Sequence, residues 1–106
     1  MNNCVFLGRL VDKPELADHY GTQVLRFKMS IDKYRKSKTG QKIRDRNHLA
    51  FEAWDSGART ISDHCENGDT LVVNCTARNN EGGVVCRVNE FKIMNNSPQT
   101  LLDEEN

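Results

Sequence analysis

Apolar and polar residues alternate with a period of two along much of this chain, the pattern of β-strands that have one buried face. The alternation is clearest over residues 24–31, where the apolar positions are Leu25, Phe27, Met29 and Ile31. It recurs over 48–54 and 71–78, and less regularly over 84–94, where a shift in apolar parity predicts a β-bulge. The apolar run at 3–10 predicts a first strand, and Pro14 should end it.

One stretch follows a helical period instead. Ala58, Ile61 and Cys65 are spaced by three and four residues, Ser56 is the expected N-cap, and Asn67-Gly68 is a stop signal. The predicted order is therefore three strands, one short helix and two strands. This order favours an all-β fold, a small five-stranded barrel with the helix between strands three and four.

With 106 residues, the chain is long enough for one domain. From residue 95 onward the periodicity disappears and acidic residues accumulate, so we expect a domain at 1–94 and an acidic mobile tail at 95–106. No apolar run approaches the roughly 20 residues that a membrane helix needs. The first residues also lack the pattern of a secretory signal. We expect a cytoplasmic protein with no membrane association.

The four cysteines show no Cys-x-x-Cys spacing, which argues against zinc or a disulfide framework. Cys75 and Cys86 lie in apolar alternations, as free cysteines that pack as small hydrophobes do. Asp63, His64 and Cys65 are adjacent, so their side chains point in different directions and no metal site is expected. No nucleophile with its base and no paired carboxylates have a useful spacing, so we expect neither an enzyme nor a cofactor. A small metal-dependent nuclease is the nearest catalytic alternative.

Charge is distributed unevenly along the chain. The formal net charge is zero, yet residues 33–46 contain seven basic residues and one acidic residue, a net charge of +6 that the remainder balances with −6. Tyr34 is the one aromatic residue in this basic stretch, and Thr39-Gly40 is its turn signal. We expect the stretch to form the tip of a long hairpin that faces a polyanion.

The strand that follows the basic stretch has an unusual outer face. Period two places Trp54, the only tryptophan, on the outward side together with His48 and Glu52. A partner should cover the exposed indole, either an unpaired base or a second subunit. Cations bind phosphates of any sequence, whereas aromatic rings add stacking that only unpaired bases can offer. These residues predict a preference for single-stranded nucleic acid.

Five segments, in order and spacing over residues 1–94, resemble the bacterial single-stranded DNA-binding proteins. They are Val-Phe-Leu-Gly-Arg-Leu-Val-Asp-Lys-Pro-Glu-Leu at 5–16, Val-Leu-Arg-Phe-Lys-Met-Ser-Ile-Asp at 24–32, Ala-Trp-Asp-Ser-Gly-Ala at 53–58, Asn-Gly-Asp-Thr-Leu-Val-Val at 67–73 and Val-Asn-Glu-Phe at 88–91. The resemblance implies an OB-fold and sequence-independent binding and protection of single-stranded DNA in replication, recombination or repair. It also implies a homotetramer or homodimer, with replication or repair proteins as candidate partners.

The resemblance also suggests roles for individual residues. Trp54 corresponds to a family aromatic that stacks on a base, Tyr34 lies within a residue of another, and His48 replaces a third. A further family aromatic is missing from the short loop at 79–83, which implies a smaller footprint or a lower affinity. The predicted DNA-binding residues are Arg9, Arg26, Lys28, Lys33, Tyr34, Arg35, Lys36, Lys38, Lys42, Arg44, Arg46, His48, Trp54 and Arg78.

Other interpretations remain open. The tail lacks the Pro-Phe end of the family, as expected of a truncated form, a short paralogue, or a phage or plasmid relative. The protein could be a replication-restart accessory of the same fold that acts mainly as a protein-interaction module. An OB-fold RNA binder of the cold-shock type would cluster several aromatics on two neighbouring strands, which this chain does not do. The edge of the first strand near 3–7 is the expected dimer contact.

Overall fold

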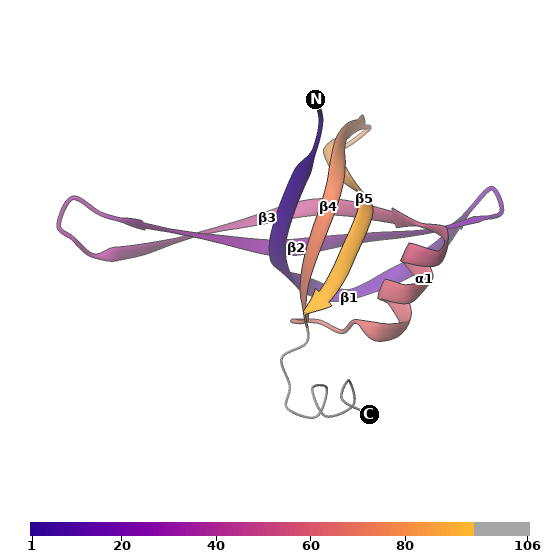
Figure 1. Ribbon diagram of the computed structural model, residues 1–106, viewed down its shortest axis with the longest axis horizontal. Helices are drawn as coiled ribbons and strands as arrows, with labels where there is room; N and C mark the ends of the chain where they lie inside the picture. The colour runs from indigo at the N-terminus through magenta and orange to yellow at the C-terminus, as the bar shows by residue number, and fades with distance from the viewer. Residues whose placement is uncertain (95–106) are drawn as a thin grey trace.

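Five strands and one helix make up the computed structural model, which describes residues 1–94. The elements are β1 (Cys4–His19), β2 (Thr22–Lys36), β3 (Lys42–Trp54), α1 (Asp55–His64), β4 (Thr70–Asn80) and β5 (Gly83–Met94). The strands close into a barrel in the order β1-β2-β3-β5-β4 (Figure 1), and β3 and β5 pair in parallel while the other pairs are antiparallel. The predicted five-stranded OB-fold barrel with one helix between strands three and four is confirmed. The predicted acidic tail lies outside the described residues.

The core is built from the alternating apolar positions, as period two predicts. Inward side chains from all five strands are buried, among them Leu10, Leu25, Phe27, Met29, Phe51, Leu71, Val73 and Cys86. The ring of Phe51 stacks on that of Phe27, with centroids 5.6 Å apart, and meets the edge of Phe6 at 5.7 Å. Aromatic pairs at these separations add to the stabilisation that burial provides. These contacts tie β1, β2 and β3 together inside the barrel.

Helix α1 lies against β1, β2 and β3 (Figure 1). Ala58 and Ile61 on the helix are fully buried, and so is Cys65 just after it, which confirms the predicted helical spacing. Ser56 was predicted as the N-cap, and that is wrong, because β3 runs without a break to Trp54 and α1 begins at Asp55. Asp55 makes the abrupt turn with a positive φ of 57°.

Strand β1 is longer than predicted, because Pro14 does not end it. A shift of register between Val11 and Glu15 forms a bulge that takes up Pro14, so the missing N–H costs no regular ladder hydrogen bond. Beyond the bulge β1 pairs with β2 as far as His19. Before it, from Cys4 to Arg9, β1 pairs with β4, so this one strand joins the two sides of the barrel.

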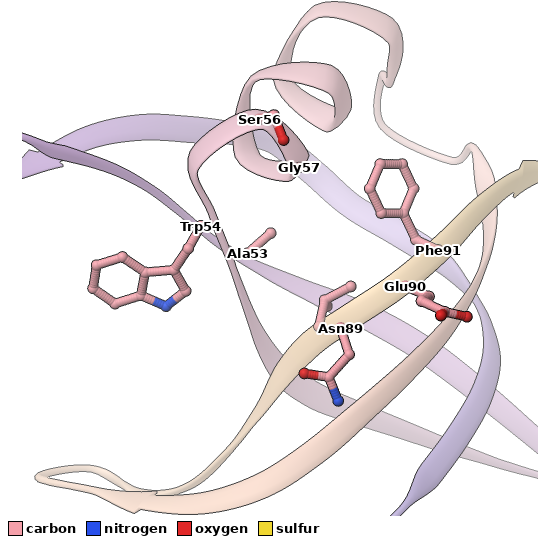
Figure 2. Close-up of a pocket in the computed structure, with 8 residues that line it drawn as sticks. Ala53, Trp54, Ser56, Gly57, Asn89, Glu90 and Phe91 are labelled. Carbon is pink, nitrogen blue, oxygen red and sulfur yellow. The ribbon is translucent and has the colours of Figure 1, made fainter.

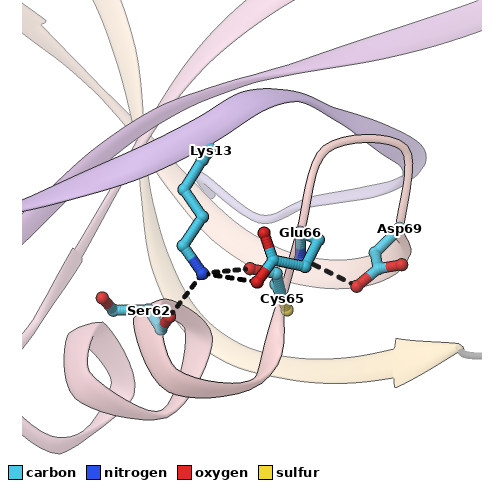
Figure 3. Close-up of polar contacts among 5 residues, drawn as sticks. All are labelled: Lys13, Ser62, Cys65, Glu66 and Asp69. Atoms are coloured by element: carbon cyan, nitrogen blue, oxygen red, sulfur yellow. Dashed lines mark hydrogen bonds and ion pairs between the residues drawn. The ribbon is translucent and has the colours of Figure 1, made fainter.

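The bulge in β1 carries Lys13 to the end of α1 (Figure 3). Its Nζ donates to the carbonyl oxygens of Ser62 at 3.4 Å and Cys65 at 3.2 Å, and to Oε1 of Glu66 at 2.8 Å. The last carbonyls of a helix have no partner within the helix, and a cation there also complements the helix dipole. Lys13 therefore caps α1 from a strand that is distant in sequence.

Strand β5 contains the predicted bulge. Asn74 of β4 pairs with Glu90 and the next residue, Cys75, pairs with Val88, so Asn89 is the extra residue in β5. The bulge changes which parity faces inward. Cys86 and Val88 therefore pack on the core before the bulge, while Phe91 and Ile93 do so after it.

The cysteines are free thiols within the described residues, and three of the four are buried. Burial raises the pKa of Cys65 to about 11 and that of Cys75 to about 12. Both thiols are therefore protonated at neutral pH, which suits residues that pack rather than react.

Replacement of Lys13 tests the tertiary cap. Lys13→Met keeps most of the side-chain stem but removes the ammonium group, so we expect the free energy of unfolding to fall by about 0.5–1 kcal/mol, a modest loss because both ends of the ion pair are well exposed. Urea denaturation measures the change. Lys92→Met is the control, since Lys92 is exposed on β5 and makes no ion pair among residues 1–94. An equal loss in both variants would contradict the capping role.

Candidate nucleic-acid interface

The register of β2 with β3 sorts the residues of the predicted basic hairpin onto two faces. The two strands pair continuously from Val24 opposite Trp54 to Lys36 opposite Lys42, and the ribbon extends well beyond the barrel (Figure 1). Paired residues share a face, and the face alternates at each position. The face opposite Phe27 and the core we call the outer ribbon face. Its functional candidates are Arg26, Lys28, Tyr34, Lys36, Lys42, Arg44, Arg46, His48 and Trp54.

The remaining predicted site residues lie elsewhere. Arg9 of β1 pairs with Ser30 and so adjoins the outer ribbon face from the side. Lys33 and Arg35 have the opposite parity on β2, and Lys38 lies in the turn at the tip. Arg78 comes from β4 and contacts β3. The fold thus brings together nine of the predicted residues with Arg9 beside them, and separates Lys33, Arg35 and Lys38 from that face.

Three arginines and a histidine line a hollow of about 280 Å³ where the ribbon meets β1: Arg9, Arg44, Arg46 and His48. Asp32 holds two of these guanidinium groups. Its Oδ2 accepts from Nε of Arg44 at 3.0 Å and from Nη2 at 2.6 Å, and Nε of Arg46 lies 3.7 Å from Oδ1. The hydrogen bonds from Arg44 hold the pKa of Asp32 below its usual range. One carboxylate thus orients two arginines and leaves the group of three arginines with a net positive charge.

Tyr34 lies further out on the ribbon and is half-exposed. The Nζ of Lys42, on the paired strand, is 4.3 Å from the centroid of its ring, a cation–π contact across the outer ribbon face. A single cation covers one face of a ring. With 53% of its surface exposed, Tyr34 remains accessible to a ligand despite this contact.

The surroundings of Trp54 differ from the prediction that its indole is uncovered on the outer face. The guanidinium carbon of Arg87 lies 5.3 Å from the centroid of the indole ring. The His19 ring meets the indole edge to face, with centroids 5.8 Å apart and an interplanar angle of 79°. The sequence pattern could not reveal this cover, because Arg87 comes from β5 and His19 from the end of β1. Figure 2 shows Trp54 and Phe91 on opposite sides of a cleft of about 500 Å³ between the start of α1 and the bulge of β5.

Glu52 is a fully buried carboxylate next to this cleft, with 1% of its surface exposed. It accepts two hydrogen bonds from Arg78, Nε to Oε1 at 2.5 Å and Nη2 to Oε2 at 2.9 Å. Burial alone would raise the pKa of Glu52, but the Arg78 hydrogen bonds, the nearby Trp54 indole and the charge of Arg87 together lower it. The indole Nε1 of Trp54 is itself buried, and it makes no hydrogen bond of good geometry among the described residues. Glu52 thus largely neutralises the charge of Arg78. Arg87, by contrast, forms no ion pair among the described residues.

Comparison with known proteins adds to this geometry. Residues 1–82 match the sequence model of the Single-strand binding protein family. The chain belongs to this family. No curated protein sequence matches it.

Solved structures with the same fold have low sequence identity to this chain. The wild-type single-stranded DNA-binding protein of Thermus aquaticus superposes with a TM-score of 0.77 and 14% identity, over 91% of this chain and 51% of that one, so this chain spans about half its length. The second such protein of Mycobacterium smegmatis gives 0.71 and 17%, over 87% of each chain. PriB of Ralstonia solanacearum gives 0.73 and 10%, over 90% of this chain and 99% of that one.

The sequence pattern did not identify two neighbours of Trp54, Arg87 and His19, nor Tyr20 next to His19. Arg87 has no clear facing in the sequence because the inward parity of β5 changes at its bulge, and His19 lies at the end of β1, where no apolar alternation marks it. Tyr20 received no role, although its side chain is 96% exposed. An aromatic residue in a polar turn was the available signal for it.

Residues 1–94 contain no group of three or more histidine, cysteine, aspartate or glutamate side chains placed to hold a metal ion. None of the helices in this part of the chain is both long and apolar enough to cross a membrane.

The ion pair between buried Glu52 and exposed Arg78 predicts an acid-sensitive fold. Because the pKa of Glu52 in the folded state lies below its ordinary value of 4.5, the ion pair stabilises the fold above that value, and this stabilisation is lost as the pH falls through the folded-state pKa. Melting temperatures between pH 6 and pH 3 measure the loss.

A glutamine in place of Glu52 is the matching test. Glu52→Gln should be less stable at neutral pH, since it leaves Arg78 without its carboxylate, and should lose less stability on acidification than the wild type. Glu90→Gln is the control, because Glu90 is exposed and forms no ion pair within the described residues. A pH profile of Glu52→Gln as steep as that of the wild type would show that the acid sensitivity arises elsewhere.

Proposed function

We propose that this protein binds single-stranded DNA without sequence preference and protects it during replication, recombination or repair. The outer ribbon face carries the proposal, because it combines cations and aromatic rings on one continuous surface in a member of the Single-strand binding protein family. Binding without catalysis, in the cytoplasm, with replication or repair proteins as further partners, is part of the same proposal.

Phosphates would bind to the cations of the outer ribbon face. Lys28 and Lys36 form no ion pairs among the described residues, and the hollow lined by Arg9, Arg44 and Arg46 keeps a net positive charge despite Asp32. Each phosphate that a cation neutralises releases counterions, so the affinity falls steeply as salt rises. This part of the interaction does not depend on sequence.

Bases would stack on Tyr34, His48 and Trp54. The Arg87 contact that covers Trp54 is worth about 0.5–1 kcal/mol at an exposed site, whereas a stacked base is worth about 1–3 kcal/mol. A base can therefore displace Arg87 from the indole, and the released guanidinium is then free to pair with a phosphate. Duplex DNA offers phosphates but no unstacked bases, so single strands are preferred.

A second candidate function is that of a replication-restart accessory that acts mainly through protein contacts. The β4–β5 turn is only Glu81-Gly82 and provides no aromatic ring, and the chain has the fold of PriB over nearly the whole PriB chain. This function predicts weak binding to DNA and strong binding to a protein partner. The size and affinity of the single-strand interaction therefore distinguish the two.

Fluorescence of Trp54 tests the proposed function directly, because the chain has no other tryptophan. A thymine homopolymer should quench it, and the affinity should fall between a low and a high salt concentration, while duplex DNA should quench much less. Trp54→Ala should weaken single-strand binding by about 1–3 kcal/mol, measured with a labelled oligonucleotide. Absence of quenching, or equal quenching by duplex, would refute the stacking mechanism.

We also propose a homodimer or homotetramer. From Cys4 to Gly8, β1 pairs with β4 on one side and with no strand on the other, and Val5 and Leu7 expose 63% and 59% of their surfaces there. Several copies would let one strand of DNA contact several domains.

Light scattering should give two or four times the chain mass of 12.1 kDa. Leu7→Lys should lower that mass, because a lysine at the contact would have to be desolvated. A monomeric wild type at micromolar concentration would contradict the assembly.

A further inference from the structure

Two more aromatic rings continue from Trp54 onto the turn between β1 and β2. The His19 ring lies 5.8 Å from the indole of Trp54, and the Tyr20 ring lies 4.7 Å from that of His19, both in edge-to-face geometry. Three rings thus follow one another from the end of the outer ribbon face to the tip of the turn, at the opposite end of the ribbon from the basic tip (Figure 1).

The backbone at Tyr20 is unfavourable for tyrosine. Tyr20 and Gly21 form a two-residue turn with φ values of 51° and 83°. Such a turn needs positive φ at both positions and favours Asn-Gly, because asparagine tolerates this conformation and a bulky residue does not. Tyr20 is 96% exposed, so its edge contact with His19 is too small to compensate for the strain. Strained residues of this kind concentrate at functional sites.

We propose that Tyr20, supported by His19, stacks on an unpaired base beyond the one at Trp54, so that a single strand runs along the outer ribbon face and continues over the β1–β2 turn. This inference rests on the proposed function and extends its site by two residues that the sequence pattern did not select. An exposed, strained ring that continues a row of rings from Trp54 matches the flat surface of a base.

The charges around the turn indicate how this contact works. A hollow beside it is lined by Asp18 and Asp55 as well as Arg59, and Arg59 donates to Oε1 of Gln23 at 2.8 Å. Two carboxylates would repel a phosphate, and the one guanidinium already donates a hydrogen bond to Gln23. The turn therefore contributes stacking rather than charge, and its contribution should not change with salt.

Tyr20→Asn separates stability from binding. The replacement suits the turn, so its melting temperature should rise by roughly 2–5 °C. It also removes the ring, so its affinity for a thymine homopolymer should fall about fivefold or more, with the salt dependence unchanged. Tyr20→Phe keeps the ring and should match the wild type in both affinity and melting temperature.

Val84→Asn is the matched control. Val84 is another exposed apolar residue, 65% exposed next to the β4–β5 turn, and its replacement should leave the affinity unchanged. Wild-type affinity in Tyr20→Asn, while the homopolymer still quenches Trp54 in the wild type, would overturn the inference and leave the proposed function intact. A wild type that binds no single strand would instead refute the proposed function.

Light scattering on Tyr20→Asn excludes the remaining explanation. If the variant binds more weakly and also has a different mass from the wild type, the turn is an assembly contact and the inference is overturned. An unchanged mass with a raised melting temperature and a weakened affinity supports it. Tyr20→Ala gives a second, independent removal of the ring.

Discussion

Continuous pairing between β2 and β3 is the constraint on which the fold and the candidate site both depend. In the barrel half of the ribbon, Phe27 and Phe51 are paired and buried. A shift of the register by one residue would place such a ring on the solvent side. The half that projects beyond the barrel has no core to fix it. Its register is fixed by the buried half, because the pairing is continuous. This register places Tyr34 on the same face as Arg44 and His48.

Acidic residues within the basic surface have a positioning role. Asp32 holds Arg44 and Arg46 at the base of the projecting ribbon, and buried Glu52 holds Arg78 beside Trp54. Each carboxylate lowers the local charge but fixes the direction of guanidinium groups on long, flexible stems. The surface therefore contains both oriented arginines and lysines such as Lys28 and Lys36 that form no ion pair within residues 1–94.

At the Trp54 end of the surface, the proposed stacking residue is partly covered in the free protein. Arg87 and His19 shield the indole from water through weak contacts, which a base can replace because stacking is stronger. Tyr20, beyond them, keeps its ring exposed at the expense of backbone strain. The two ends of the ribbon thus differ: the hairpin tip is rich in charge, and the β1–β2 end is rich in rings.

By itself, the sequence determined the fold class, the order of the elements, the inward residues, the bulge of β5 and the basic hairpin, because these depend on local periodicity and turn chemistry. It did not predict that β1 continues past Pro14, since only pairing with β2 makes a bulge there cheaper than a break. Nor did it predict the cover on Trp54, or that Lys33 and Arg35 lie on the other face from Tyr34. The tertiary structure decided these points, because they depend on which strands meet and in which register.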